Sequence, residues 1–255
     1  MSRENALSVR ETFSGVWLIT GRELGAYFDS SIAYVYSIAF VVLANSIFMN
    51  EFFLTGTVDM TGFFDLLPLL LAIFLPAVTM RLWAEERKQR TIELLLTLPI
   101  RPLQAILGKY LAALALYGLF LIGSLPIVVM LLALGDPDPG LILSGYLGLI
   151  FLGALFLASG MFLSALSGDQ IVAFVTSTLL GFFLVLTGND KVVAVLDGLV
   201  PALSLGTHLY ESISVTPHFD GFVRGVVEFH SLVYFFAMSA VFLWATSLVL
   251  KLNRT

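Results

Sequence analysis

Long stretches without a single charged side chain constrain this sequence more than any other feature. A helix needs about 20 apolar residues to cross a hydrocarbon core of about 30 Å, and a charged side chain inside that core costs several kcal/mol. Six such stretches occur, over residues 30–50, 66–80, 110–135, 139–168, 170–189 and 231–250. We therefore predict an all-α polytopic membrane protein with six transmembrane helices.

The composition agrees with a membrane protein and excludes several other classes. The 255 residues are 58% hydrophobic and 12% charged, whereas soluble domains are roughly 45–50% apolar and about 25% charged. The net charge of −5 argues against nucleic-acid binding. Because cysteine is absent, disulfides and thiolate metal ligands are excluded. The polar first residues predict that no removable signal peptide is present.

The stretches also set expected domain boundaries. Arg81 can extend its guanidinium to the lipid headgroups and Trp83 suits the interfacial aromatic belt, so we extend the short second span to residue 83. Residues 1–29 are expected to form a cytoplasmic N-terminus with an interfacial helix, and residues 251–255 a cytoplasmic tail. The six-span domain, 30–250, has spans at about 30–50, 66–83, 110–135, 140–167, 170–188 and 231–250.

The distribution of basic residues predicts the orientation. With both termini on one side, only Lys191 and Arg224 lie on the opposite side. The side with the termini holds Arg3, Arg10, Arg22, Arg81, Arg87, Lys88, Arg90, Arg101, Lys109, Lys251 and Arg254. The positive-inside rule therefore places both termini in the cytoplasm, and we expect a multi-pass protein of the inner membrane.

The segment 14–28 separates into two sides on a helical wheel. Arg22, Glu23 and Ala26 lie on the polar side, and Ile19 is an exception. The apolar side carries Trp17, Leu18, Gly21, Leu24, Gly25 and Phe28. This pattern predicts an amphipathic helix in the cytoplasmic interface, with Trp17, Arg22 and Phe28 at the membrane surface. A disordered lead into the first span is the alternative.

Two other segments are not expected to span. In the cytoplasmic loop 84–109, charged residues precede a helix-forming run, 92–98, that Pro99 ends. This helix either docks on a soluble partner or is a solvated connector. The external segment 188–230 is interrupted by Asp197, Gly198 and Pro201, so we predict short re-entrant or interfacial helices there.

The fourth span is rich in small residues, which allow helix backbones to approach closely. We therefore place this helix in the interior of the bundle. The small residues are Gly145, Gly148, Gly153, Ala154, Ala158, Ser159, Gly160 and Ser164.

Three segments resemble one known family. EERKQRTIELLLTLPI, at 85–100, looks like the cytoplasmic hallmark segment of type-2 ABC transporter permeases. GRELGAYFDSSIAYV, at 21–35, and HFDGFVRGVVEFHSLVYF, at 218–235, resemble the gliding-motility-associated branch of that family. The resemblance covers most of the chain in order.

The resemblance implies a permease whose coupling helix inserts into a groove on a separate cytoplasmic ABC ATPase. The positions that match this contact are Glu85, Glu86, Arg87, Thr91, Ile92 and Glu93. Arg90 is a departure, because the family often has glycine before the threonine. The resemblance further implies a second permease subunit, identical or paired, and surrounding membrane lipids; an extracytoplasmic accessory protein is compatible with it. No cofactor is expected on this chain, since ATP and Mg²⁺ would be bound by the ATPase.

Catalytic motifs are not found in the sequence. A phosphate-binding loop, G-x-x-x-x-G-K-[ST], is missing, because Gly108 and Lys109 are followed by Tyr110 and lack the upstream glycine. The peptide LSGDQ, at 166–170, resembles the ABC signature but stands alone. No acidic, basic or histidine residue lies in the uncharged stretches, which argues against a proton-coupled or ion-coupled transporter. His208, His218 and His230 match no metal-ligand spacing.

Two functions from different classes remain compatible with the sequence. The first is the permease subunit of an ABC-type exporter, which is not an enzyme by itself. The second is a membrane anchor or assembly protein that transports nothing and recruits a soluble factor through its cytoplasmic helix. An intramembrane enzyme would need the histidines of the external segment to be catalytic.

Overall fold

The computed structural model describes residues 3–89, 102–199 and 204–252, and these residues form helices and short connections without a strand. The helices are α1 Arg3–Phe28, α2 Ser31–Thr55, α3 Thr61–Thr79, α4 Arg81–Lys88, α6 Pro102–Ile122, α7 Leu125–Leu134, α8 Pro139–Leu166, α9 Gln170–Leu186, α10 Asp190–Leu199, α11 Leu205–Ser212, α12 Thr216–Val223 and α13 Phe229–Leu252. The all-α prediction is confirmed for this part of the chain.

Five helical segments are long and apolar enough to cross a membrane. They are Ser31–Thr55, Thr61–Lys88, Pro102–Leu134, Pro139–Leu166 and Phe229–Leu252. A sixth is formed if α9 and α10, which meet at 89°, count as one broken span. Each predicted span overlaps one of these segments. Two segments begin earlier than predicted, at Thr61 and Pro102. A helix can continue beyond the hydrocarbon core, whereas an uncharged stretch ends at the first charged residue.

Two of the long segments are interrupted at residues whose chemistry accounts for the break. Between α6 and α7 the chain passes Gly123 and Ser124, and Pro126 stands in the first turn of α7, where a proline is tolerated. Between α3 and α4 the break falls at Met80, four residues after Pro76. The predicted second and third spans are therefore each built from two helices.

Helix α8 forms the centre of the bundle. In its most apolar window 61% of the residues are buried, close to the 67% of the segment Thr61–Lys88 and well above the 17% of α2 and 22% of α13. The rings of Phe64 and Tyr117 pack directly on Gly145 and Gly153, where a side chain would collide with them. The predicted interior position of the fourth span is confirmed.

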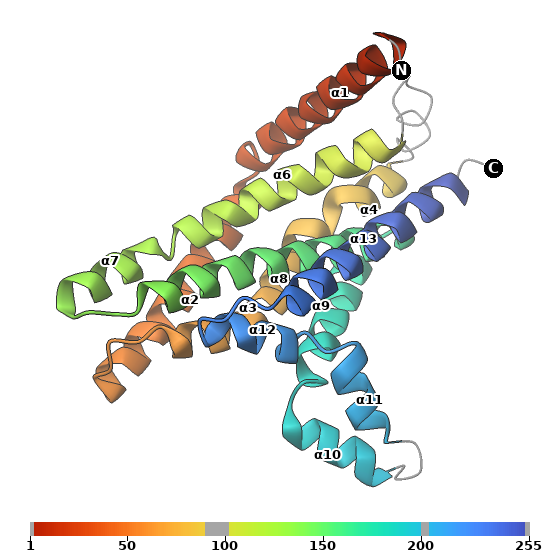
Figure 1. Cartoon of the computed structure of the whole chain (residues 1–255). Coiled ribbons are helices and arrows are strands. Elements are labelled where there is room, and N and C mark those ends of the chain that lie inside the picture. The colour runs from red at the N-terminus through yellow and green to blue at the C-terminus, as the bar shows by residue number, and fades with distance from the viewer. Residues whose placement is uncertain (1–2, 90–101, 200–203, 253–255) are drawn as a thin grey trace.

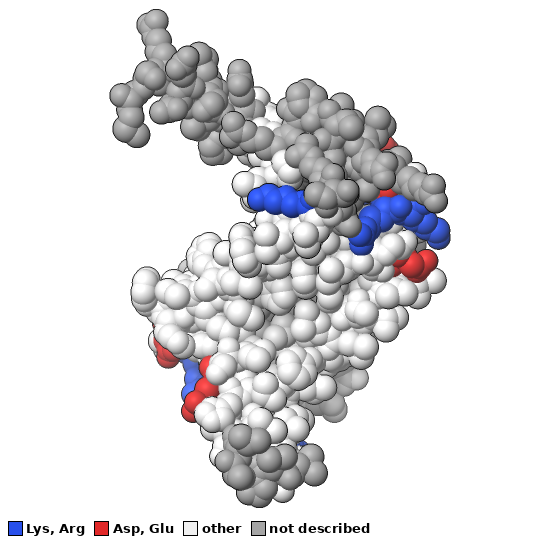
Figure 2. All heavy atoms as spheres, turned by 90° about the vertical axis from the view of Figure 1, so that its right-hand side faces the viewer, with Lys and Arg blue, Asp and Glu red and all other residues white. Residues whose placement is uncertain are grey.

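The two ends of the bundle differ in composition from its middle. The N-terminal end of α1, the C-terminal end of α13 and helix α4 lie at one end, and α10 and α11 lie at the other (Figure 1). Figure 2 shows charged side chains near both ends and an uncharged band between them. Helices α10, α11 and α12 occupy most of the segment 188–230. Their position relative to the membrane stays a prediction.

Candidate coupling site

Helix α1 packs lengthwise on the first half of α6. Its buried side carries Val16, Ile19 and Thr20, and the contact depends on Gly108, where a Cβ would lie 2.7 Å from Ile19. Thr20 Oγ1 donates to the Gly108 carbonyl at 3.2 Å or to that of Val16 at 2.9 Å. Ile19, which did not fit the predicted amphipathic pattern, therefore belongs to a separate face that contacts the protein.

The predicted membrane-facing residues of α1 lie at the surface. Trp17 is 68% exposed and Phe28 is 49% exposed, and Arg22, on the polar side of the helix, is exposed as well. Large exposed apolar side chains on a helix of a membrane protein suit contact with lipid. Their position at the membrane interface stays a prediction.

A buried lysine connects three helices at this end of the bundle. The Lys109 side chain, on α6, is only 3% exposed, and its Nζ lies 3.2 Å from Glu23 Oε1 on α1 and 2.9 Å from Glu86 Oε1 on α4. The same Nζ lies 5.1 Å from the centre of the Trp83 ring, a cation–π contact. One buried cation is thus paired with two carboxylates, which makes it costly to remove any of the three.

The pKa of the Glu23 carboxyl reflects this environment. Burial raises the pKa, but the charges of Lys109 and Arg22 outweigh burial and lower it below its usual value of 4.5. Arg22 Nη2 donates to Glu23 Oε1 at 2.7 Å. Glu23 is therefore ionised at neutral pH, and its pairing with Lys109 does not depend on small changes in pH.

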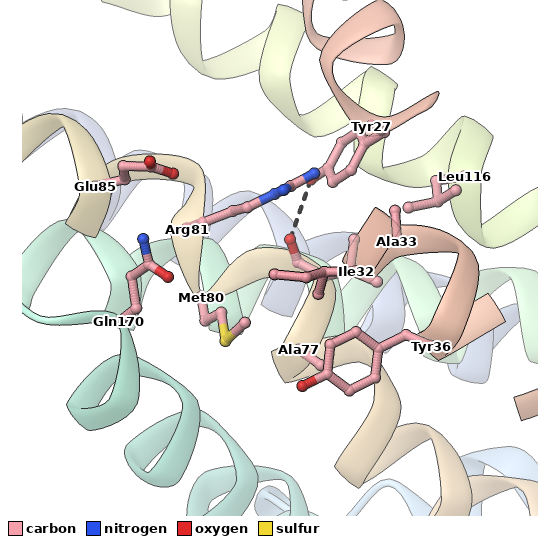
Figure 3. Close-up of a pocket in the computed structure, with 11 residues that line it drawn as sticks. Tyr27, Ile32, Ala33, Tyr36, Ala77, Met80, Arg81, Glu85, Leu116 and Gln170 are labelled. Carbon is pink, nitrogen blue, oxygen red and sulfur yellow. Dashed lines mark hydrogen bonds between the residues drawn. The ribbon is translucent and has the colours of Figure 1, made fainter. Parts of the chain in front are cut away.

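Arg81 and Tyr27 form a second contact between α1 and the α3–α4 break. The Arg81 guanidinium lies 4.8 Å from the centre of the Tyr27 ring, and its Nη1 donates to Ser30 Oγ at 2.9 Å. The Tyr27 hydroxyl donates to the Val78 carbonyl at 3.1 Å, which is the dashed line in Figure 3. We call Glu23, Arg81, Glu85, Glu86 and Lys109 the polar junction.

Trp83 differs from the expectation that it stands in the interfacial aromatic belt. Its side chain is completely buried, with 0% exposed, because it is turned inward under Lys109. Arg81, the other predicted interface residue of this helix, is half-buried. The sequence shows a tryptophan at the end of a span, but only packing decides which way its ring faces.

Helix α4 is also fastened to the end of α8. The Ser164 hydroxyl accepts from the amides of Trp83 and Ala84, at 3.1 and 3.2 Å, and donates to the Met80 carbonyl at 2.9 Å. Arg87 Nη1 donates to the carbonyls of Ala165 and Leu166, at 2.9 and 2.8 Å. Amides at a helix start and carbonyls at a helix end lack partners within their own helix, so these bonds stabilise the α4–α8 contact.

The predicted coupling residues fall into two groups. Glu85, Glu86 and Arg87 lie on α4 in this junction. Thr91, Ile92 and Glu93, together with Arg90, lie outside the described residues. Sequence reasoning missed Glu23 and Lys109 as partners; the one available signal was a lysine directly before a long uncharged stretch.

Two of the three histidines in the segment 188–230 lie close together, and the third is apart from them. His218 is buried, with its ring centre 4.0 Å from that of Tyr234 and 4.8 Å from that of His230. His208 is exposed on α11. No three acidic or histidine residues among those described are close enough together to hold a metal ion. These contacts are those of a packed aromatic cluster.

The fold is that of a multi-pass helical membrane protein. It has long apolar helices, a central helix rich in small residues, and charged side chains near its two ends. The sequence model described as "ABC-2 family transporter protein" matches residues 30–249. The chain therefore belongs to the ABC-2 family of transporter membrane proteins, and the resemblance to type-2 permeases is confirmed. The comparison with individually curated proteins gives no match.

Proposed function

We propose that this chain is the permease subunit of an ABC-type exporter of the inner membrane and that a separate cytoplasmic ATPase drives it. The family match over residues 30–249 carries the proposal, since ABC-2 membrane domains are transport components. The gliding-motility-associated branch is the subgroup that the segments at 21–35 and 218–235 favour. Both termini and the loop 84–109 would face the cytoplasm.

The polar junction supports a role for α4 in transmitting force. Residues 85–93 would contact the ATPase, and the C-terminal half of α4 is the first part of that segment. Glu86 connects α4 to Lys109 of α6, and through it to Glu23 of α1, while Arg87 connects α4 to α8. A displacement of the docking segment would therefore be transmitted to α6, α1 and α8 through these contacts. ATP must favour one arrangement of these helices over another for transport to follow.

The translocation pathway would lie between two permease subunits, identical or paired. Within one subunit the described part of α8 is closely packed through Gly145, Gly153 and Gly160, which leaves its centre filled. The segment 188–230 would cover the external mouth, and an accessory protein outside the cytoplasm would meet it there. ATP and Mg²⁺ would be held by the ATPase.

This function is tested by purifying the permease together with its partner and measuring the rate of ATP hydrolysis. The solubilised permease should elute with a soluble ATPase, and the complex should hydrolyse ATP faster than the ATPase alone. Ile92→Asn and Glu93→Ala should remove this stimulation while the permease stays folded, because the substitutions lie in the docking segment. The matched control Glu211→Ala, on exposed α11, should retain the stimulation.

The alternative of an anchoring protein predicts a different result. A recruited factor that is not an ATPase, or an ATPase whose activity is unchanged by the permease, would favour the anchor. Full stimulation in the Ile92 and Glu93 variants would show that the ATPase docks elsewhere.

A further inference from the structure

Two cavities adjoin each other at the polar junction. The first has a volume of about 160 Å³, and its apolar part is lined by Ile32, Ala33, Ala77 and Leu116. Ile32 is 55% exposed on α2, and α2 is apolar and long enough to cross a membrane, so this cavity opens toward a surface that lipid would contact. Its volume suits a headgroup or a short length of acyl chain.

The second cavity is polar and has a volume of about 290 Å³. Glu23, Glu86 and Lys109 line it, and Tyr27, Arg81 and Glu85 line both cavities. A molecule that occupies both spaces must therefore be amphiphilic, with its charged part beside Arg81 and Glu85. The uncharged stretch 66–80 ends at Met80, and Arg81 and Glu85 follow directly after it, so in a bilayer these two charges would lie beside the phospholipid headgroups.

The Arg81 guanidinium has N–H groups that can donate hydrogen bonds to such a molecule. A guanidinium has five N–H donors, and the described contacts of Arg81 are one hydrogen bond to Ser30 and the stacking on Tyr27. It forms no ion pair with any residue in the described ranges. In Figure 3 the guanidinium extends across the cavity toward Tyr27. Its planar group of donors matches the oxygens of a phosphate.

Glu85 supplies the opposite charge in the same place. Its Oε1 accepts from Gln89 Nε2 at 3.2 Å, and no cation of the described chain pairs with it. Glu85 and Gln170 lie on one side of Arg81 in Figure 3, and Tyr27 and Leu116 on the other. A ligand that carries an ammonium group close to a phosphate would satisfy both charges.

We propose that these cavities bind a zwitterionic aminophospholipid of the phosphatidylethanolamine type. Its phosphate would lie on Arg81, its ammonium on Glu85, and the start of an acyl chain beside Ile32 and Leu116. An anionic lipid such as phosphatidylglycerol fits less well, because its headgroup has no cation for Glu85 and meets the further carboxylates of Glu23 and Glu86. The proposal does not depend on ATP-driven transport.

Lipid titration of the purified full chain by native mass spectrometry tests the proposal, and no ATPase is needed. Phosphatidylethanolamine should bind at least about ten-fold more tightly than phosphatidylglycerol, the ratio expected for one charge-assisted hydrogen bond. Arg81→Gln and Glu85→Gln should each weaken phosphatidylethanolamine binding by about ten-fold. The matched controls Arg224→Gln and Glu211→Gln, exposed at the opposite end, should bind it as the unaltered chain does.

A variant with all charges intact separates the site from a general effect on folding. Ile32→Trp places a large ring at the entrance of the apolar cavity and should weaken phosphatidylethanolamine binding by about ten-fold without changing the polar junction. Soluble glycerophosphoethanolamine should bind far more weakly than the lipid. Equal affinity for the two lipids, unaltered binding by Ile32→Trp, or equal affinity for the soluble headgroup would each overturn the proposal.

Discussion

At the scale of single residues, the buried charge of Lys109 leads to a prediction about stability. Its ammonium is buried between Glu23 and Glu86, so its removal leaves two carboxylates without their shared cation. Breaking a buried pair in this way costs about 3–5 kcal/mol. We expect Lys109→Met to lower the free energy of unfolding in detergent by about 3 kcal/mol.

The control for this prediction is Lys88→Met. The Lys88 side chain is 66% exposed, and its one ion pair with a described residue is a long contact of 3.8 Å to Asp169, so its loss should change stability by no more than about 0.5 kcal/mol. Similar losses in both variants would contradict a special role of Lys109. In a double-mutant cycle, Glu23→Gln should recover part of the loss.

His218 provides a pH-dependent prediction at the same scale. Burial lowers the pKa of its imidazole below the usual 6.5, and the nearby His230 lowers it further while Glu228 raises it. The folded protein therefore binds this proton less readily than the unfolded chain, so stability is lost as the pH falls below 6.5. Thermal unfolding measured between neutral and mildly acidic pH should show this loss, and His218→Phe should reduce it. An unchanged pH profile in the variant would argue against His218 as its source.

At the scale of elements, the close contacts of α8 explain its small residues. Gly153 packs against the Tyr117 ring, whereas Gly118, on α6, has no atom within 4 Å of its would-be Cβ. Overpacking of a filled core costs about 1–3 kcal/mol, so Gly153→Val should destabilise the protein by this amount. Gly118→Val should cost clearly less in the same unfolding measurement. Equal costs would mean that helix propensity, and not packing, decides both.

At the scale of the whole molecule, the absence of cysteine makes the orientation directly measurable. Lys88 and Arg224 are exposed at opposite ends of the bundle, and the excess of basic residues predicts that Lys88 lies in the cytoplasm. A membrane-impermeant maleimide should label Arg224→Cys in intact spheroplasts and Lys88→Cys only after permeabilisation. The reverse pattern would place the docking segment outside the cell and exclude an ATPase partner there.

The sequence by itself determined the membrane class, the approximate spans and the family. Uncharged stretches such as 139–168 are a direct consequence of the bilayer, since hydrocarbon excludes charge along the chain whatever the neighbouring helices are. The segment 85–100 was enough to indicate a type-2 permease, which the match over 30–249 confirmed. The small residues of the fourth span likewise predicted its interior position.

Only the tertiary structure decided which charges meet and which rings are buried. Glu23, Glu86 and Lys109 are far apart in sequence, and their pairing depends on α1 lying along α6 and on α4 turning beneath it. The burial of Trp83 and the availability of Arg81 follow from the same arrangement. The reason is physical: hydropathy reports the solvent around a helix, whereas specific contacts depend on which faces of distant helices pack together.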